Sequence, residues 1–171
     1  IRPPSLAFSL LFTSVGAAAK SDSNLTFGVV SGGSSFFEPL KDGWENMCSV
    51  LGANCHYVVP NWSDFDREMY IHPCVFEMRE LIKQKVDGIA VACTYDAPEV
   101  FQEAADAGIP VVTVDSPPPP EIPHDAYVGT DNSFMGRTLA RLLKQLRPEG
   151  GTFAIIAVPW AENQNLRVQG F

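Results

Sequence analysis

The chain has 171 residues, with 20 acidic against 12 basic side chains, which gives a formal net charge of −8. Because nucleic-acid binding depends largely on cationic side chains that neutralise phosphates, this charge argues against a nucleic-acid partner. Hydrophobic residues make up 46% of the chain and charged residues 19%. This composition is typical of a globular protein with a packed core, and it excludes a disordered acidic tail, a collagen-like rod and a coiled coil.

The first 19 residues have the order of a secretory signal peptide. Arg2 precedes an apolar run from Ser5 to Val15, and the small residues Ala17–Ala19 follow as a cleavage site. The alternative is a buried helix or a membrane anchor, but spanning a bilayer takes about 20 apolar residues. We therefore expect a signal peptide over residues 1–19, a mature chain that does not span a membrane, and a periplasmic or secreted location.

From Leu25 onward, β-rich runs alternate with segments of helical periodicity. Strands are expected at 25–30, 55–59, 88–92, 111–114, 126–130 and 152–158, and helices at 37–51, 74–85, 98–107, 134–146 and from 163 onward. No hairpin signal separates consecutive strands, so right-handed crossovers should produce an α/β fold with a doubly wound parallel sheet covered on both faces. The prolines in Ser116–Pro120 cannot donate hydrogen bonds to a sheet, and this segment is expected to be an exposed, extended connector.

The four cysteines, Cys48, Cys55, Cys74 and Cys93, contain no CxxC spacing, which argues against a zinc or redox site. We expect no cofactor. In a parallel sheet of the predicted order, Cys48 and Cys55 share one end and Cys74 and Cys93 share the other. If disulfides form, these two pairs are therefore the ones expected, because other pairings exceed a Cα separation near 7 Å. Free buried thiols are the alternative.

Ligands of parallel sheets bind at the carboxyl ends of the strands. The loop Ser31–Phe37 follows the first strand and matches neither GxGxxG nor a P-loop. It ends in Phe36 and Phe37, and an exposed aromatic ring can cover the C–H face of a sugar. Phe37 also fits the apolar face of the first helix and could belong to the core, whereas Phe36 lies off that face.

Two charged residues follow other strands. Asp115 ends the fourth strand, where its carboxylate could accept two hydroxyl hydrogen bonds; a solvated loop acid or a turn former is the alternative. Arg167 lies after the sixth expected strand, where it could donate to sugar oxygens; a surface salt bridge is the alternative. None of the three histidines has a nucleophile at a recognisable local spacing, so an enzyme is not expected.

Five ordered segments resemble type I periplasmic binding proteins of the ribose-binding and related sugar-binding kind. They are Ser34–Gly43, Val86–Ile89, Ala107–Asp115, Val128–Asn132 and Arg167–Phe171. The resemblance covers Leu25–Phe171. It implies two similar α/β lobes that close on one small ligand for delivery to a membrane transporter or a chemoreceptor. Residues 20–129 would form the first ligand-binding lobe, and residues 130–171 would begin a second, incomplete lobe, so we interpret the chain as a fragment.

The resemblance also assigns site residues. Phe36 and Phe37 match the aromatic residues that sandwich the sugar, and Ser34 replaces a polar asparagine. Asp115 matches the aspartate that binds sugar hydroxyls, and Arg167 matches the ligand-binding arginine of the second lobe.

The chain departs from the ribose-binding pattern at two positions. Ala92 stands where the family has an asparagine, and Ser116 stands where it has an arginine. These departures argue against ribose itself, and Tyr95 is the expected replacement for the lost contacts.

The function expected from the resemblance is an extracytoplasmic solute-binding protein that captures a sugar or small polyol between two lobes. The partners would be the sugar and either an ABC-transporter permease or a chemoreceptor. An extracellular sensor domain of a receptor is the first alternative, and an enzyme on the same fold is the second.

Overall fold

The computed structural model describes residues 25–61, 73–92, 97–158 and 161–171. Its centre is a five-stranded parallel sheet with the strand order β2-β1-β3-β4-β5. The strands are β1 (Thr26–Val30), β2 (Asn54–Val58), β3 (Gly88–Val91), β4 (Val111–Val114) and β5 (Ala126–Val128). The α/β fold class and the parallel, doubly wound sheet predicted from the sequence are confirmed.

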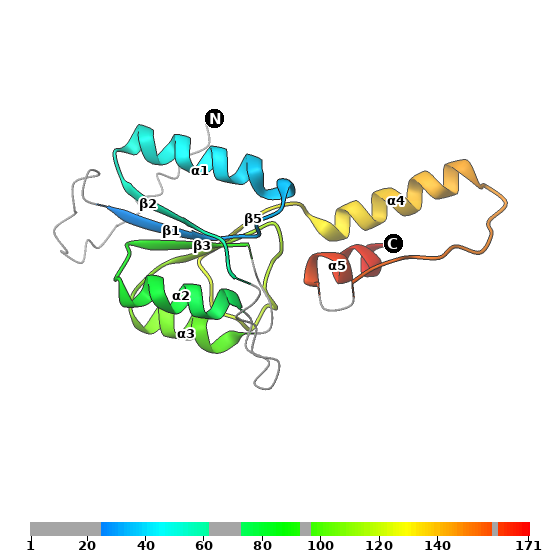
Figure 1. The fold of residues 1–171 in the computed structure, drawn as a ribbon. Coiled ribbons are helices and arrows are strands. Elements are labelled where there is room, and N and C mark those ends of the chain that lie inside the picture. Colours follow the sequence, from blue (N-terminus) through cyan, green and yellow to red (C-terminus); the bar gives the residue numbers. More distant parts are fainter. Residues whose placement is uncertain (1–24, 62–72, 93–96, 159–160) are drawn as a thin grey trace, which may run out of the picture.

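Helices cover both faces of this sheet. They are α1 (Glu38–Leu51), which follows the short 3-10 helix η2 (Ser35–Phe37), α2 (Pro73–Lys83) and α3 (Pro98–Asp106). Figure 1 shows α1 on one face of the sheet and α2 with α3 on the other. We call residues 25–128, which include these elements, the sheet lobe.

The hydrophobic core lies between the sheet and the α2–α3 layer. The strands contribute Val30, Ile89, Val91 and Val111, and the two helices contribute apolar side chains at helical spacing. Those helical residues are Cys74, Val75, Met78, Leu81, Val100, Phe101 and Ala104. Gly28 of β1 makes room for this layer, because a Cβ at Gly28 would come within 2.5 Å of the Leu81 methyl groups.

The opposite helix, α1, is less deeply buried than its apolar pattern predicts. None of its residues is fully buried, and Met47 and Leu51 of the predicted apolar face are 56% and 43% exposed. Gly52 ends α1 as predicted. Its φ of 63° lies in the left-handed region, where glycine is favoured, and its N–H caps the carbonyl groups of Cys48 and Ser49.

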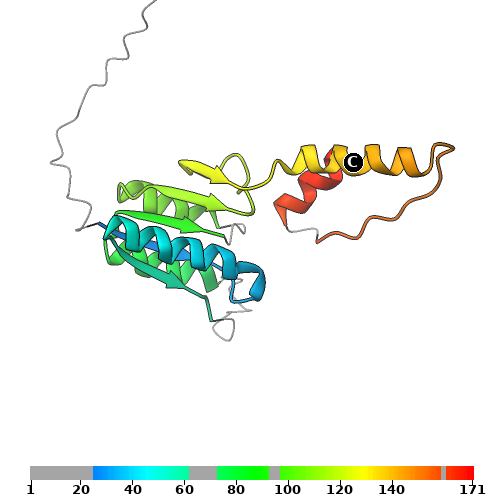
Figure 2. The same ribbon diagram turned by 90° about the horizontal axis from the view of Figure 1, so that it is seen from above.

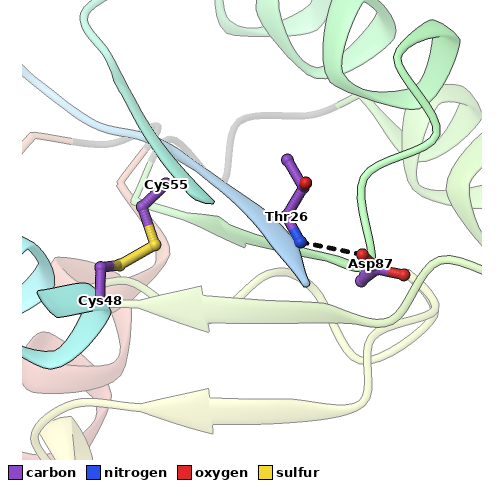
Figure 3. Close-up of a disulfide and its surroundings, with 4 residues drawn as sticks. All are labelled: Thr26, Cys48, Cys55 and Asp87. Atoms are coloured by element: carbon purple, nitrogen blue, oxygen red, sulfur yellow. Dashed lines mark hydrogen bonds between the residues drawn. A yellow bond between two sulfur atoms is a disulfide. The ribbon is translucent and has the colours of Figure 1, made fainter. Parts of the chain in front are cut away.

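A disulfide joins Cys48 in the last turn of α1 to Cys55 at the start of β2, across a Cα–Cα distance of 6.1 Å. Figure 3 shows this disulfide and, at the start of β1, the hydrogen bond from the Thr26 N–H to the Asp87 carboxylate. The Cys48–Cys55 prediction is therefore confirmed. Cys74 is also disulfide-bonded, whereas its predicted partner Cys93 lies outside the described residues.

Beyond β5, the chain forms α4 (Asn132–Leu146), an extended segment and α5 (Glu162–Gly170). Figures 1 and 2 show that α4 and α5 extend away from the sheet and lie side by side. Two glycines allow this close approach. A Cβ at Gly136 would overlap the Arg167 carbonyl oxygen, and a Cβ at Gly170 would overlap the Ser133 carbonyl oxygen. We call the described part of residues 131–171 the helical region.

The strand predicted at 152–158 is wrong for this structure. The segment is not assigned to a sheet, and within the described residues its amides from Thr152 to Ala157 make no backbone hydrogen bond. A strand requires a neighbour to pair its backbone groups, and the described helical region contains only α4 and α5 beside this segment. Large apolar side chains of this segment are exposed to solvent, and Ile156 is 99% exposed.

The proline-rich connector differs from its prediction. The connector Ser116–Pro120 was predicted to be exposed, but Pro118 is buried and Pro117 and Pro119 are half-buried.

No helix among the described residues is long and apolar enough to cross a membrane.

Candidate functional site

The loop after β1 presents the two predicted aromatic residues side by side. The rings of Phe36 and Phe37 meet edge to face, with centroids 5.0 Å apart. Phe36 is 69% exposed, whereas Phe37 is half-buried, and its ring packs so closely on Gly32 that a Cβ there would lie within 2.6 Å. Phe36 is therefore the ring available to a ligand, and Phe37 supports it.

Ser34 opens the turn that carries these rings. Its backbone carbonyl accepts a hydrogen bond from the Phe37 N–H at 2.9 Å, and its side chain does not cap η2. The exposed Ser34 hydroxyl remains available for other contacts.

The carboxyl end of β1 also carries a buried hydroxyl that the sequence analysis did not single out. Ser31 is 0% exposed, and its Oγ has no hydrogen-bond partner among the described residues. Ala92 lies at the carboxyl end of β3, the strand next to β1, and its N–H bonds the Val30 carbonyl. The backbone groups here are paired, and the Ser31 hydroxyl is a buried polar group without a partner among the described residues, which is uncommon in a sealed core.

Asp115 follows β4 in a left-handed conformation with φ of 67°. Its N–H donates to the Val128 carbonyl at 3.0 Å, so the turn is held against β5. Partial burial raises the pKa of the Asp115 carboxyl, while the positive charge of Arg167 opposes that rise. The two predicted charged residues therefore lie close enough to interact electrostatically, although Asp115 belongs to the sheet lobe and Arg167 to α5.

A series of hydrogen bonds links the Asp115 turn to Arg167. The Arg167 Nε–H donates to Asn132 Oδ1 at 2.8 Å. Asn132 Nδ2 lies 3.0 Å from the Thr130 carbonyl and 3.3 Å from the Tyr127 hydroxyl. The Tyr127 hydroxyl lies 2.9 Å from the Asp115 carbonyl and 3.1 Å from that of Thr130, and its one proton can be donated to either.

Sequence reasoning did not single out Tyr127, and it named Asn132 only as the end of the segment Val128–Asn132. Asp131 is the N-cap of α4, since its Oδ1 accepts the Phe134 N–H at 2.8 Å. The available signal was the pair Asp131-Asn132 at the start of a helical pattern, because only one of these two side chains can be the N-cap.

The site therefore has two groups of residues along one edge of the sheet. Ser34, Phe36 and Phe37 lie beside the end of β1, and Asp115 lies at the end of β4, two strand spacings or about 10 Å across the sheet. Arg167 approaches the second group from α5. Tyr95 lies outside the described residues. Among the described residues, no cluster of three or more His, Cys, Asp or Glu side chains could hold a metal ion.

Comparison with known proteins identifies the family. The model of the periplasmic binding protein domain matches residues 26–171. No match was found among curated protein sequences.

Two solved structures illustrate the structural similarity. A solute-binding protein of an ABC transporter from Burkholderia graminis, in complex with D-arabinose, is 27% identical with a TM-score of 0.73 and covers 85% of this chain and 50% of its own. A glucose-galactose binding protein from Geobacillus stearothermophilus is 29% identical with a TM-score of 0.73, at 86% and 52% coverage. The chain thus spans about half the length of these relatives, which are solute-binding proteins.

The parallel sheet order and the match over residues 26–171 point to the same family. The chain belongs to the periplasmic binding protein domain family, and its fold is that of the type I periplasmic binding proteins.

Proposed function

We propose that this chain contributes the first lobe, residues 20–129, and the beginning of the second lobe, residues 130–171, to an extracytoplasmic protein that captures a sugar or a similar polyol. The observation that carries the proposal is that Arg167 of α5 lies near enough to Asp115 at the end of β4 for its positive charge to act on the Asp115 carboxyl. An acceptor and a donor contributed by two different lobes suit a ligand that carries many hydroxyl groups.

The aromatic pair supports the same class of ligand. Phe36 offers an exposed apolar ring at the carboxyl edge of the sheet, and such a ring packs against the C–H face of a sugar. The sugars named with the similar structures, D-arabinose and glucose or galactose, are of this kind. In the proposed function, Ser34 and Tyr95 add polar contacts, and binding occurs without chemical conversion of the ligand.

The partner we propose for the loaded protein is an ABC-transporter permease, the kind of system named for the relative from Burkholderia graminis. The location outside the cytoplasm is supported by the Cys48–Cys55 disulfide, since disulfides persist mainly in oxidising compartments. The proposed signal peptide, residues 1–19, would direct export, and protein recovered from the exported fraction should then begin near Lys20.

Titration calorimetry tests the proposal directly. A two-lobed protein that includes this chain should bind one of D-arabinose, D-glucose or D-galactose with one site per molecule. Asp115→Asn keeps a residue that tolerates a positive φ but replaces one acceptor oxygen by a donor, and it should weaken binding by about 1–3 kcal/mol. Glu121→Ala, an exposed acid in the same β4–β5 connection, is the control and should bind normally.

The contribution of the aromatic ring is tested in the same assay. Phe36→Ala should weaken binding while the melting temperature without ligand stays unchanged, because the ring is exposed. Phe153→Ala removes another exposed ring, from the segment between α4 and α5, and should leave affinity unchanged. A lower melting temperature with unaltered affinity in Phe36→Ala or Asp115→Asn would show that these residues serve the fold and not the ligand.

A further inference from the structure

Asn132 is an unusual residue for the first turn of a helix, because its side chain is almost completely buried. The residue is 2% exposed, and it is one of only two buried residues of α4. Both ends of its amide are used. Oδ1 accepts from Arg167 Nε, and Nδ2 lies within hydrogen-bond distance of the Thr130 carbonyl and the Tyr127 hydroxyl. A buried amide that is satisfied at both ends fixes the orientation of the groups it contacts.

The other buried residue of α4 contacts the same arginine. Gly136 lies one helical turn after Asn132 and therefore on the same face of α4. Because Gly136 has no side chain, the Arg167 backbone carbonyl can approach α4 closely. Gly136 thus sets the position of the Arg167 backbone, and Asn132 sets the direction of its side chain.

The hydrogen bond to Asn132 occupies only the Nε–H of the guanidinium. Among the described residues, the Nη1 and Nη2 groups of Arg167 make no hydrogen bond. An arginine held through Nε presents these two terminal nitrogens in a fixed plane. This is the arrangement that a bidentate contact to ligand oxygens requires.

The connection continues to the sheet lobe through Tyr127. Burial raises the pKa of the Tyr127 hydroxyl, which therefore stays neutral and can donate, and it lies 2.9 Å from the Asp115 carbonyl. Gly129 leaves room for this hydroxyl, since a Cβ there would overlap it. Hydrogen bonds therefore run from the Asp115 turn through Tyr127 and Asn132 to Arg167.

We propose that Asn132 is a positioning residue that orients the Arg167 guanidinium toward the ligand, and that Tyr127 couples this orientation to the Asp115 turn. This inference rests on the proposed function for the identity of the ligand. The orientation of Arg167 itself is a property of the chain without ligand and can be measured separately.

The first experiment uses the 171-residue chain and the 15N–1H resonance of the Arg167 Nε–H, assigned by its loss in Arg167→Lys. In the wild type this proton should exchange slowly, and the N–H vector should be ordered. Leucine has a shape similar to asparagine but no acceptor. In Asn132→Leu, the exchange rate of the Arg167 Nε–H and the order of its N–H vector should therefore reach the values of the exposed Arg141. Asn132→Asp retains the acceptor and should restore the ordered signal. An unchanged Arg167 Nε–H in Asn132→Leu would overturn the proposal.

Loss of the fold in Asn132→Leu would be recognised from the backbone amide spectrum. Tyr127→Phe is the milder variant for that case, because it keeps the ring and removes only the hydroxyl. It should reduce the order of Arg167 partially, and identical order in Tyr127→Phe and wild type would overturn the coupling to the Asp115 turn.

The second experiment is a double-mutant cycle on affinity in the two-lobed protein, with whichever of D-arabinose, D-glucose and D-galactose binds. Asn132→Leu should weaken binding about tenfold when Arg167 is present and should have no further effect in Arg167→Ala. Equal effects in both backgrounds would show that Asn132 does not act through Arg167, and would overturn the inference while the proposed function stands. If no sugar binds the wild type, the proposed function fails, and the Arg167 resonance alone decides the positioning role.

Discussion

The sheet lobe and the helical region contain helices with similar sequence patterns but very different burial. In the sheet lobe, α2 and α3 place Met78, Leu81 and Phe101 against the strands, and each is no more than 2% exposed. In the helical region, α4 has an equally clear apolar face, yet Leu139 and Leu142 are 48% and 49% exposed. The difference shows that an amphipathic pattern specifies a helix and its apolar face, whereas burial of that face requires a partner layer.

The apolar side chains of the helical region surround an open cavity of about 600 Å³ between α4, residues 152–157 and α5. The only two buried residues of α4 are Asn132 and Gly136, and both contact Arg167. Close packing in this region is thus concentrated where α4 meets α5 beside the candidate site.

A matched pair of leucine substitutions should give the largest difference between the two regions. Leu81→Ala opens a cavity in the core of the sheet lobe and should lower the free energy of unfolding by about 2–5 kcal/mol. Leu142→Ala removes a half-exposed side chain and should cost below about 1 kcal/mol. Urea unfolding followed by circular dichroism measures both. Equal losses would mean that the apolar face of α4 is covered in solution.

The Cys48–Cys55 disulfide should stabilise the sheet lobe alone. Replacing both cysteines by serine releases a loop with a sequence separation of 7 and should cost about 2–3 kcal/mol, from the chain entropy of the unfolded state. Hydrogen exchange should quicken in β1 and β2 and remain unchanged in α4. Faster exchange in α4 would show that the two regions unfold together.

Loss of the α4 N-cap should destabilise the helical region and leave the sheet lobe unchanged. Asp131→Ala removes the acceptor for the Phe134 N–H and should destabilise the start of α4 by about 1 kcal/mol. Hydrogen exchange of the amides at 134–138 measures this change, and Asp131→Asn, which can still cap, serves as the control. A comparable change in the strands would contradict the independence of the regions.

The smallest effect expected is on the pH dependence of stability at Asp115. Its folded pKa is raised above its ordinary value of 3.8, so its favourable contribution is present below that value and is lost as the pH rises through the folded pKa. Asp115→Asn should remove this loss and slightly raise the free energy of unfolding at pH 7 relative to pH 4. The measurement compares urea unfolding of both proteins at the two pH values. A steeper pH dependence in the variant would refute the effect of burial.

The sequence alone was sufficient for the elements of the sheet lobe. Alternating β-rich runs and helical periods predicted β1 to β5 and α1 to α3 close to their observed ends, because each element carries its own local pattern and stop signals such as Gly52. The Cys48–Cys55 pair followed from topology, since the turn after α1 brings both cysteines to one end of the sheet.

Features that depend on contacts between distant segments were decided only by the tertiary structure. Residues 152–158 have the composition of a strand but form none here, because backbone pairing needs a neighbouring strand. Helical spacing already placed Phe36 off the apolar face, but only the tertiary structure shows that the Phe37 ring packs on Gly32. The link from Asp115 through Tyr127 and Asn132 to Arg167 joins residues up to 52 positions apart, as 167 minus 115 gives, and no local pattern specifies such a contact.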